Sequence, residues 1–210
     1  METETKLRKF WEDEITKEFY QKSPSDYIVN VFNKIDNSAT ILDIGCGAGR
    51  YLNYLDKKGY KNLVGVDYSK KMLSYINSPN IKTLNADMKN IPLQCKYDVV
   101  LSIGVLHNVT NLKEFELAVS EISRLLKNGG MCICSVFTND IITSDLYFVK
   151  DNLYLIEKET PVYLLDKKSL VNIFAANNLI IDKIIDEHIT KVSTIGERNV
   201  YTFILKHSEV

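Results

Sequence analysis

Short apolar runs alternate with amphipathic stretches from residue 40 onward, and this rhythm is the main structural signal in the chain. Apolar runs typical of buried strands lie near 40–45, 63–67, 81–84, 97–103 and 131–137. Helices are expected between them, near 49–58, 69–77 and 112–127, and Asn128-Gly129-Gly130 is a typical end for the last one. Strand, helix and strand in repetition predict right-handed crossovers and a parallel sheet that helices cover on both faces.

The segment before residue 40 is predicted to form one or two helices. Within 5–35 the apolar positions have near-helical spacing, at Leu7, Phe10, Trp11, Ile15 and Phe19. Ser23-Pro24-Ser25-Asp26 interrupts this pattern and can cap a second helix, which carries Ile28, Val31 and Phe32. We expect these helices to form a small N-terminal cap on the sheet.

After residue 138 the pattern loosens into a hairpin, a helix and two strands. Apolar runs at Leu146–Val149 and Leu153–Glu157 flank Asp151-Asn152, a pair typical of a hairpin turn. A helix is expected near 167–177, followed by strands near 179–188 and 199–206. The last strand has no room for a helical crossover before it, so it should pair antiparallel with a neighbour.

Composition narrows the classes of function. A chain of 210 residues with 45% hydrophobic and 25% charged residues suits one well-packed domain. Its formal net charge of -1 gives no electrostatic case for binding nucleic acid or an anionic membrane. The four cysteines show neither a disulfide framework nor zinc spacing. The N-terminus lacks the apolar run of a signal peptide and no stretch could span a membrane, so we expect a cytoplasmic protein, monomeric or homodimeric.

A glycine-rich turn follows the first predicted strand. Ile41 to Arg50 is an apolar strand that ends near Asp43 and leads into Gly45, Gly47 and Gly49. Glycines at such a turn let a ligand approach the backbone closely. The next strand ends in Asp67 about 20 residues later, the spacing at which such sites hold ribose hydroxyls. The sequence therefore predicts a site for a small molecule that contains a nucleoside.

The charge pattern distinguishes between two nucleoside ligands. A dinucleotide normally needs a third small residue in the turn, and Arg50 stands there. Asp43 beside the turn would repel a pyrophosphate but attract an ammonium group. S-adenosylmethionine (SAM) has a ribose, an adenine, an ammonium and a cationic sulfonium but no phosphate, so the charge pattern favours it.

Five successive motifs resemble those of class I SAM-dependent methyltransferases, in particular the small-molecule branch with its methyltransferase-11/25 and tellurite/thiopurine-like groups. The motifs are Ile41–Arg50, Gly65–Leu73, Asn85–Met88, Tyr97–His107 and Leu126–Met131. The resemblance implies a doubly wound, Rossmann-like α/β fold with a mostly parallel seven-stranded sheet, an antiparallel final strand and a helical cap. The single domain 1–210 would divide into a helical cap (1–38), a cofactor-binding core (39–138) and a substrate-side insertion with C-terminal strands (139–210).

The resemblance also assigns roles in cofactor binding. Gly45, Gly47 and Gly49 would form the turn under the methionine moiety of SAM, and Asp43 would help to orient its ammonium. Asp67 would accept both ribose hydroxyls.

The adenine and the rest of the methionine pocket are assigned to later motifs. Tyr68 would pack on the adenine, Asp87 would accept a hydrogen bond from its amino group, and the Met88 N–H would bind the ring. Backbone near Ser102 and Ile103 would complete the methionine pocket.

The sequence gives fewer signals for the site of the methyl acceptor than for the cofactor site. Methyl transfer from a sulfonium is an in-line displacement in which positioning and desolvation can supply most of the acceleration. A thiolate needs no base, but a hydroxyl or an amine needs a proton acceptor. His107, at the carboxyl end of the fourth strand, is our candidate; the alternative is a residue that only shapes the pocket. His188 and His207 are predicted to be structural.

Substrate contacts are expected from aromatic residues outside the core, namely Trp11, Tyr20 and Tyr147, together with His107. No Asn/Asp-Pro-Pro-Tyr sequence and no metal-binding carboxylate cluster is visible, so we expect a metal-free enzyme that acts on a small molecule. Two alternatives remain open: a non-catalytic SAM-binding regulator or partner subunit, and a nicotinamide-dependent oxidoreductase.

Overall fold

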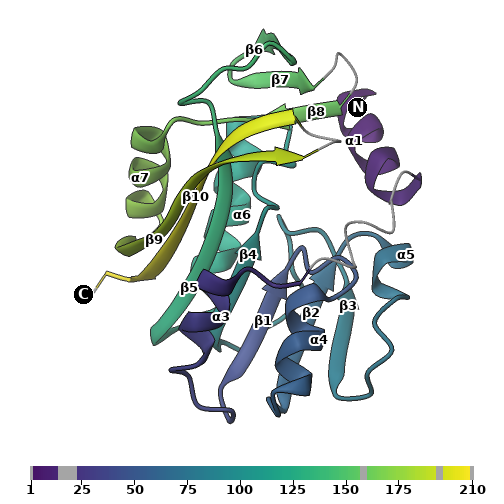
Figure 1. Ribbon diagram of the computed structural model, residues 1–210, viewed down its shortest axis with the longest axis vertical. Coiled ribbons are helices and arrows are strands. Elements are labelled where there is room, and N and C mark those ends of the chain that lie inside the picture. The colour runs from purple at the N-terminus through teal and green to yellow at the C-terminus, as the bar shows by residue number, and fades with distance from the viewer. Residues whose placement is uncertain (1, 14–22, 157–159, 193–195, 209–210) are drawn as a thin grey trace.

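A seven-stranded sheet forms the centre of the molecule (Figure 1). The computed structural model describes residues 2–13, 23–156, 160–192 and 196–208. In spatial order the strands are β3 (Ile81–Asn85), β2 (Asn62–Asp67), β1 (Thr40–Ile44), β4 (Tyr97–Ile103), β5 (Leu126–Thr138), β10 (Gly196–His207) and β9 (Leu179–Val192). The first five are parallel, and β10 is antiparallel to both β5 and β9. This confirms the predicted Rossmann-like sheet and its antiparallel last strand.

Helices cover both faces of the sheet, because alternate strand residues belong to two different cores. Leu42 and Ile44 pack with α6 (Leu112–Leu125) and α7 (Lys167–Ala176) on one side. Ile41 packs with α4 (Arg50–Lys57) and α3 (Asp26–Phe32) on the other. Side chains cap several helices: Asn111 accepts from the Glu114 N–H at the start of α6, and Ser69 accepts from the Met72 N–H at the start of α5 (Lys70–Leu73).

The junction between α6 and β5 differs from the expected one. Helix α6 ends at Leu125, and β5 begins at once with Leu126 rather than near 131. The register of β5 on β4 jumps from Leu126 opposite Tyr97 to Met131 opposite Val99, and Gly129 adopts a left-handed φ of 76° inside this irregularity. The glycines that were expected to end a helix therefore form a bulge in a strand.

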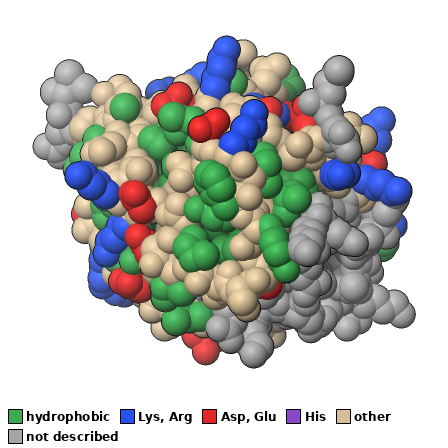
Figure 2. Space-filling model, turned by 90° about the horizontal axis from the view of Figure 1, so that it is seen from above, with side chains coloured by type: hydrophobic (Ala, Val, Ile, Leu, Met, Phe, Trp, Pro, Cys, Tyr) green, Lys and Arg blue, Asp and Glu red, His purple; other side chains and the backbone are tan. Residues whose placement is uncertain are grey.

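A second, three-stranded antiparallel sheet lies above the main one (Figure 1). It contains β6 (Leu146–Lys150), β7 (Leu153–Ile156) and β8 (Thr160–Tyr163). Asp151 and Asn152 turn between β6 and β7 with positive φ, as the hairpin prediction requires, whereas β8 was not predicted. Seen from above, hydrophobic side chains gather on this face (Figure 2), where exposed apolar residues include Tyr147, Phe148 and Val149 of β6.

The small sheet and the N-terminal helix are fixed beside the ends of β4 and β2. The Tyr163 N–H of β8 donates to the His107 carbonyl at 2.9 Å, just after β4. Helix α1 (Glu2–Asp13) is tied at its end by Lys71 Nζ, which donates to the Glu12 carbonyl at 2.8 Å. Both elements therefore stand over the carboxyl edge of the parallel sheet, where ligands of doubly wound folds bind.

Candidate cofactor and acceptor site

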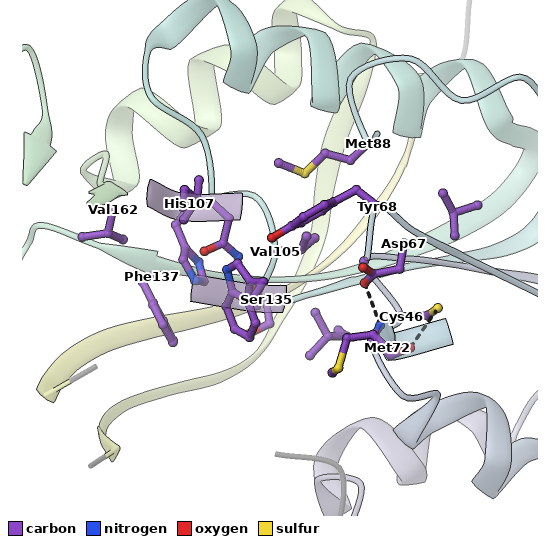
Figure 3. Close-up of a pocket in the computed structure, with 18 of the residues that line it drawn as sticks. Cys46, Asp67, Tyr68, Met72, Met88, Val105, His107, Ser135, Phe137 and Val162 are labelled. Atoms are coloured by element: carbon purple, nitrogen blue, oxygen red, sulfur yellow. Dashed lines mark hydrogen bonds between the residues drawn. The ribbon is translucent and has the colours of Figure 1, made fainter. Parts of the chain in front are cut away.

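Within the described residues, a cavity of about 380 Å³ lies at the carboxyl ends of the parallel strands. This volume is in the range of small-ligand sites, roughly 300–1,000 Å³. In Figure 3, Asp67, Tyr68 and Met72 lie on one side of the cavity, while His107 and Phe137 lie on the other. We call the first side the cofactor half and the second the acceptor half.

The glycine turn forms the floor of the cofactor half. Gly45 and Gly47 line the cavity in left-handed conformations, with φ of 71° and 53°. The N–H groups of Gly45 and Cys46 both donate to the Val66 carbonyl, at 2.8 and 3.0 Å, which fastens the turn to β2. A Cβ on Gly45 would come within 2.3 Å of Val105 Cγ2, so a side chain there would displace the cavity wall.

Asp67 connects the end of β2 to the turn. Its Oδ2 accepts from the Gly47 N–H and its Oδ1 from the Ser69 N–H, each at 2.8 Å. Burial raises the pKa of Asp67, and these two backbone donors oppose that shift. Asp67 faces the cavity, and each oxygen keeps a lone pair for a further donor (Figure 3). A ribose diol matches this arrangement.

Asp43 lies behind the turn rather than in the cavity wall. Its side chain is buried, and burial raises its pKa to about 8; Arg50 opposes the shift and Asp67 adds to it. Gly49 and Ser102 also lie outside the wall, and Ser102 is completely buried. The contribution of these three residues to cofactor binding stays a prediction.

Tyr68 and helix α1 enclose the other end of the cofactor half. The Tyr68 hydroxyl is buried and makes no hydrogen bond among the described residues, so it is open to a ligand. The Arg8 guanidinium lies 5.3 Å from the centre of the Tyr68 ring, a cation–π distance. Leu7 and Trp11 of the same helix also line the cavity. Trp11 therefore lies in the cavity wall, and its predicted contact with the substrate stays a prediction.

Asp87 is shared between the predicted adenine site and Arg8. Arg8 pairs with Asp87 Oδ2 at 2.8 Å, and the Lys89 N–H donates to Oδ1 at 3.0 Å. Both Asp87 and Met88 line the cavity, as expected. The sequence did not indicate Arg8, because 79 positions separate it from Asp87 and no local pattern connects them. An adenine amino group would therefore share this carboxylate with Arg8.

His107 and Phe137 form the wall of the acceptor half. His107 is only 4% exposed, and its ring stacks on Phe137 with centroids 4.0 Å apart and an angle of 17°. Ser135 precedes Phe137 by two residues on β5 and lines the same cavity. Val162 of β8 adds an apolar surface (Figure 3). His107 and Ile103 both line the cavity, and the role of His107 toward an acceptor stays a prediction.

The predicted substrate contact Tyr147 is not brought to the cavity. Tyr147 is 41% exposed on β6, the outer strand of the small sheet, and it is not part of the cavity wall. Strands β7 and β8 supply the wall instead, since β8 is the strand attached to His107. Tyr20 lies outside the described residues. Phe137 could have been found from its place at the carboxyl end of a predicted strand, but Val162 could not, because β8 was not predicted.

Two further properties concern metals and membranes. In the described part of the chain, no group of three or more His, Cys, Asp or Glu side chains is arranged to hold a metal ion. Among the described helices, none is long and apolar enough to cross a membrane.

The order of strands and helices is the Rossmann-like fold of class I SAM-dependent methyltransferases. Residues 42–134, a little under half of the chain, match the Methyltransf_11 family, described as a methyltransferase domain. The match covers the glycine turn, Asp67, Asp87 and His107, but it ends before Phe137, β8 and the C-terminal strands.

Two relatives match part of this chain. UbiE of Campylobacter jejuni, a ubiquinone/menaquinone biosynthesis C-methyltransferase, is 28% identical over 127 residues, which are 57% of this chain and 52% of UbiE. The tRNA (carboxymethyluridine(34)-5-O)-methyltransferase ALKBH8 of Mus musculus is 28% identical over 116 residues, 55% of this chain and 17% of ALKBH8. The chain thus matches about half or less of these relatives' lengths.

Solved structures agree in fold over nearly the whole chain. The 1,6-didemethyltoxoflavin-N1-methyltransferase of Burkholderia thailandensis, with bound 1,6-didemethyltoxoflavin and S-adenosylhomocysteine (SAH), has a TM-score of 0.69 at 15% identity. The similarity covers 98% of this chain and 87% of that one. It therefore extends the similarity of fold to the segments outside the family match.

Replacing Asp67 by Asn should weaken SAH binding by about 10- to 100-fold, the effect of losing hydrogen bonds to a charged acceptor. An amide nitrogen would also face a backbone donor, either Gly47 N–H or Ser69 N–H. Isothermal titration calorimetry measures the change. Asp182→Asn, at a half-exposed carboxylate that pairs with Lys206, is the control and should bind SAH normally. Equal affinity in Asp67→Asn and wild type would contradict the assignment.

Binding of SAH near pH 7 should release up to about one proton from Asp43. Because its pKa is raised to about 8 in the free protein, the carboxyl group is mostly protonated there, and a nearby ammonium favours the ionised form. The affinity should then rise between about pH 6 and 8. Calorimetry in buffers of different ionisation enthalpy measures the protons released. Asp43→Asn should abolish the release, and an unchanged release in this variant would assign it to another group.

Proposed function

We propose that the protein transfers the methyl group of SAM to a small-molecule acceptor by in-line displacement, without a metal ion. The acceptor nucleophile attacks the methyl carbon, the carbon–sulfur bond breaks, and SAH leaves as a neutral thioether. The observation that carries this proposal is the continuity of one cavity from Gly47 and Asp67 to His107 and Phe137. A cofactor and an acceptor in this cavity would lie next to each other.

The residues of the chain would act by positioning and by excluding water. Asp67 and the glycine turn would hold the ribose and the amino acid end of the cofactor. Helix α1 would cover the site, with Arg8 beside Asp87 and Trp11 in the wall. The stacked rings of His107 and Phe137 would give the acceptor an apolar surface. An apolar, closed surrounding favours reaction of a cationic sulfonium with a nucleophile, because charge is dispersed as the methyl group moves.

Aromatic residues of the N-terminal helices support an enzyme rather than a regulator. Trp11 of α1 and Tyr27 of α3 both line the cavity, so the cap helps to enclose a space beyond the glycine turn. A SAM-binding regulator needs no such acceptor space. The acceptor half is thus the feature that separates the two hypotheses.

The choice of a small molecule rests on charge and enclosure. Some named relatives methylate tRNA, but this chain has a net charge of -1, and neutralising a phosphate backbone requires a surplus of lysine and arginine. Two of the cations in the cavity wall, Arg8 and Lys89, are paired with carboxylates. A cavity of about 380 Å³ that must also hold the cofactor leaves room for a small acceptor.

The test is SAH formation by purified protein with SAM and a panel of thiols, amines, hydroxyl compounds, chalcogen oxyanions and unmodified tRNA. We expect turnover with at least one small-molecule class and none with tRNA. Turnover on tRNA alone would refute the proposed acceptor class. Tight SAH binding without turnover on any acceptor would support the regulator instead.

We propose that His107 accepts the proton when the acceptor is a hydroxyl or an amine. His107→Phe keeps a ring against Phe137 but removes the basic nitrogens, so kcat on such an acceptor should fall by about 10²-fold or more. On a thiolate acceptor, which carries no proton, it should change little. Steady-state kinetics on both acceptor types provides the comparison, and SAH affinity checks that the variant is folded. A kcat unchanged on hydroxyl and amine acceptors would leave His107 with a packing role only.

A further inference from the structure

His188 lies at the far end of the same cavity, although its sequence position suggested a structural role. It is on β9, the strand at the opposite edge of the sheet from β3 and β2. Its register position is opposite Val200 of β10, which is opposite Phe137 of β5, and all three residues line the cavity. Because neighbouring strands are about 4.8 Å apart, His188 lies roughly 10 Å beyond Phe137.

Asp186 orients the His188 ring. The two residues are on the same face of β9, two positions apart, and the Nδ1 of His188 bonds the Asp186 carboxylate. When the neutral imidazole donates from Nδ1, its Nε2 carries a lone pair and accepts a hydrogen bond. No described group bonds Nε2, and the His188 side chain is 40% exposed, so solvent or a ligand can reach this atom. The Tyr27 ring lies 6.4 Å from the imidazole, so an aromatic residue also stands beside it.

The pair belongs to a different part of the sheet from the predicted cofactor contacts. The glycine turn and Asp67 lie at the ends of β1 and β2, and β9 is four strands away from β1 in the order of the sheet. The lining of the cavity includes the apolar residues Phe137, Val200, Val162 and Pro161. An oriented polar pair at the end of an apolar space is the arrangement by which binding sites fix one end of a ligand.

We infer that His188, positioned by Asp186, recognises the far end of the methyl acceptor by accepting a hydrogen bond from it. The acceptor is then a small molecule with an apolar, aromatic-sized body and a hydroxyl or N–H group distant from the methylated atom. This inference rests on the proposed function, since it assumes that the acceptor half holds the substrate. It makes His188 a determinant of specificity and Asp186 a positioning residue.

The test uses matched probes that differ in one donor, added to protein saturated with SAH. Suitable pairs are 4-ethylphenol with 4-ethylanisole and indole with 1-methylindole. Ligand-observed NMR should show that 4-ethylphenol and indole, the compounds with an O–H or N–H donor, each bind about five- to tenfold more tightly than their methylated partners. In ¹⁵N spectra of the imidazoles, the His188 Nε2 signal should shift with the phenol and not with the anisole.

Variants separate hydrogen bonding from packing. His188→Phe keeps the ring but should abolish the preference for donors, while His188→Gln, whose amide oxygen can accept, should keep most of it. Asp186→Ala should reduce the preference and Asp186→Asn should restore it, because an amide oxygen still accepts from Nδ1–H. Glu187→Gln is the matched control: Glu187 is on the opposite face of β9, 3.9 Å from Lys167 of α7, and its replacement should change nothing.

Each outcome decides between the hypotheses. An equal affinity for both members of each pair, or a preference that survives in His188→Phe, would overturn the inference. Failure of every probe to bind while SAH binds would overturn the acceptor class and leave methyl transfer standing. Failure of SAH itself to bind would overturn the proposed function.

Discussion

The hydrogen bond from the Gly47 N–H to the Asp67 carboxylate is the interaction on which the site depends. It joins two segments 20 positions apart, and it forms because the parallel register places Ile44 opposite Val66. The Asp67 carboxylate is mostly buried, so its charge must be compensated, and two backbone donors do this. The same bonds hold the left-handed turn open toward the cavity. Sheet pairing, turn conformation and ligand recognition therefore depend on the same hydrogen bonds.

The acceptor half is held together by a different kind of contact. Its wall comes from β5, β8, β9 and β10, which are held together by long-range contacts rather than by one turn. The link between Tyr163 and the His107 carbonyl attaches the small sheet, and the pairing of β10 with β5 and β9 aligns Phe137, Val200 and His188. Substitutions in these strands can change what the acceptor half fits while the bonds of Asp67 stay intact.

The sequence predicts the cofactor half better than the acceptor half for a physical reason. Gly45, Gly47 and Asp67 follow strands whose apolar pattern is unmistakable, and a turn with positive φ requires glycine. Arg8 and His188, by contrast, enter the site through contacts with residues far away in the chain. Nothing in the local pattern of β8 distinguished a strand, and Asn128-Gly129-Gly130 has the composition of a helix end although it forms a bulge. In each of these examples, contacts between residues far apart in the sequence determine the structure.

The position of β10 has a consequence for the order in which the protein can assemble. This strand follows β9 in the chain but lies between β5 and β9 in the sheet rather than at an edge. Strand β9 therefore has no place in the sheet until β10 has been inserted. The parallel strands and the glycine turn can associate while the chain is still growing. The part of the cavity wall that includes His188 can form only after residue 207 has been translated.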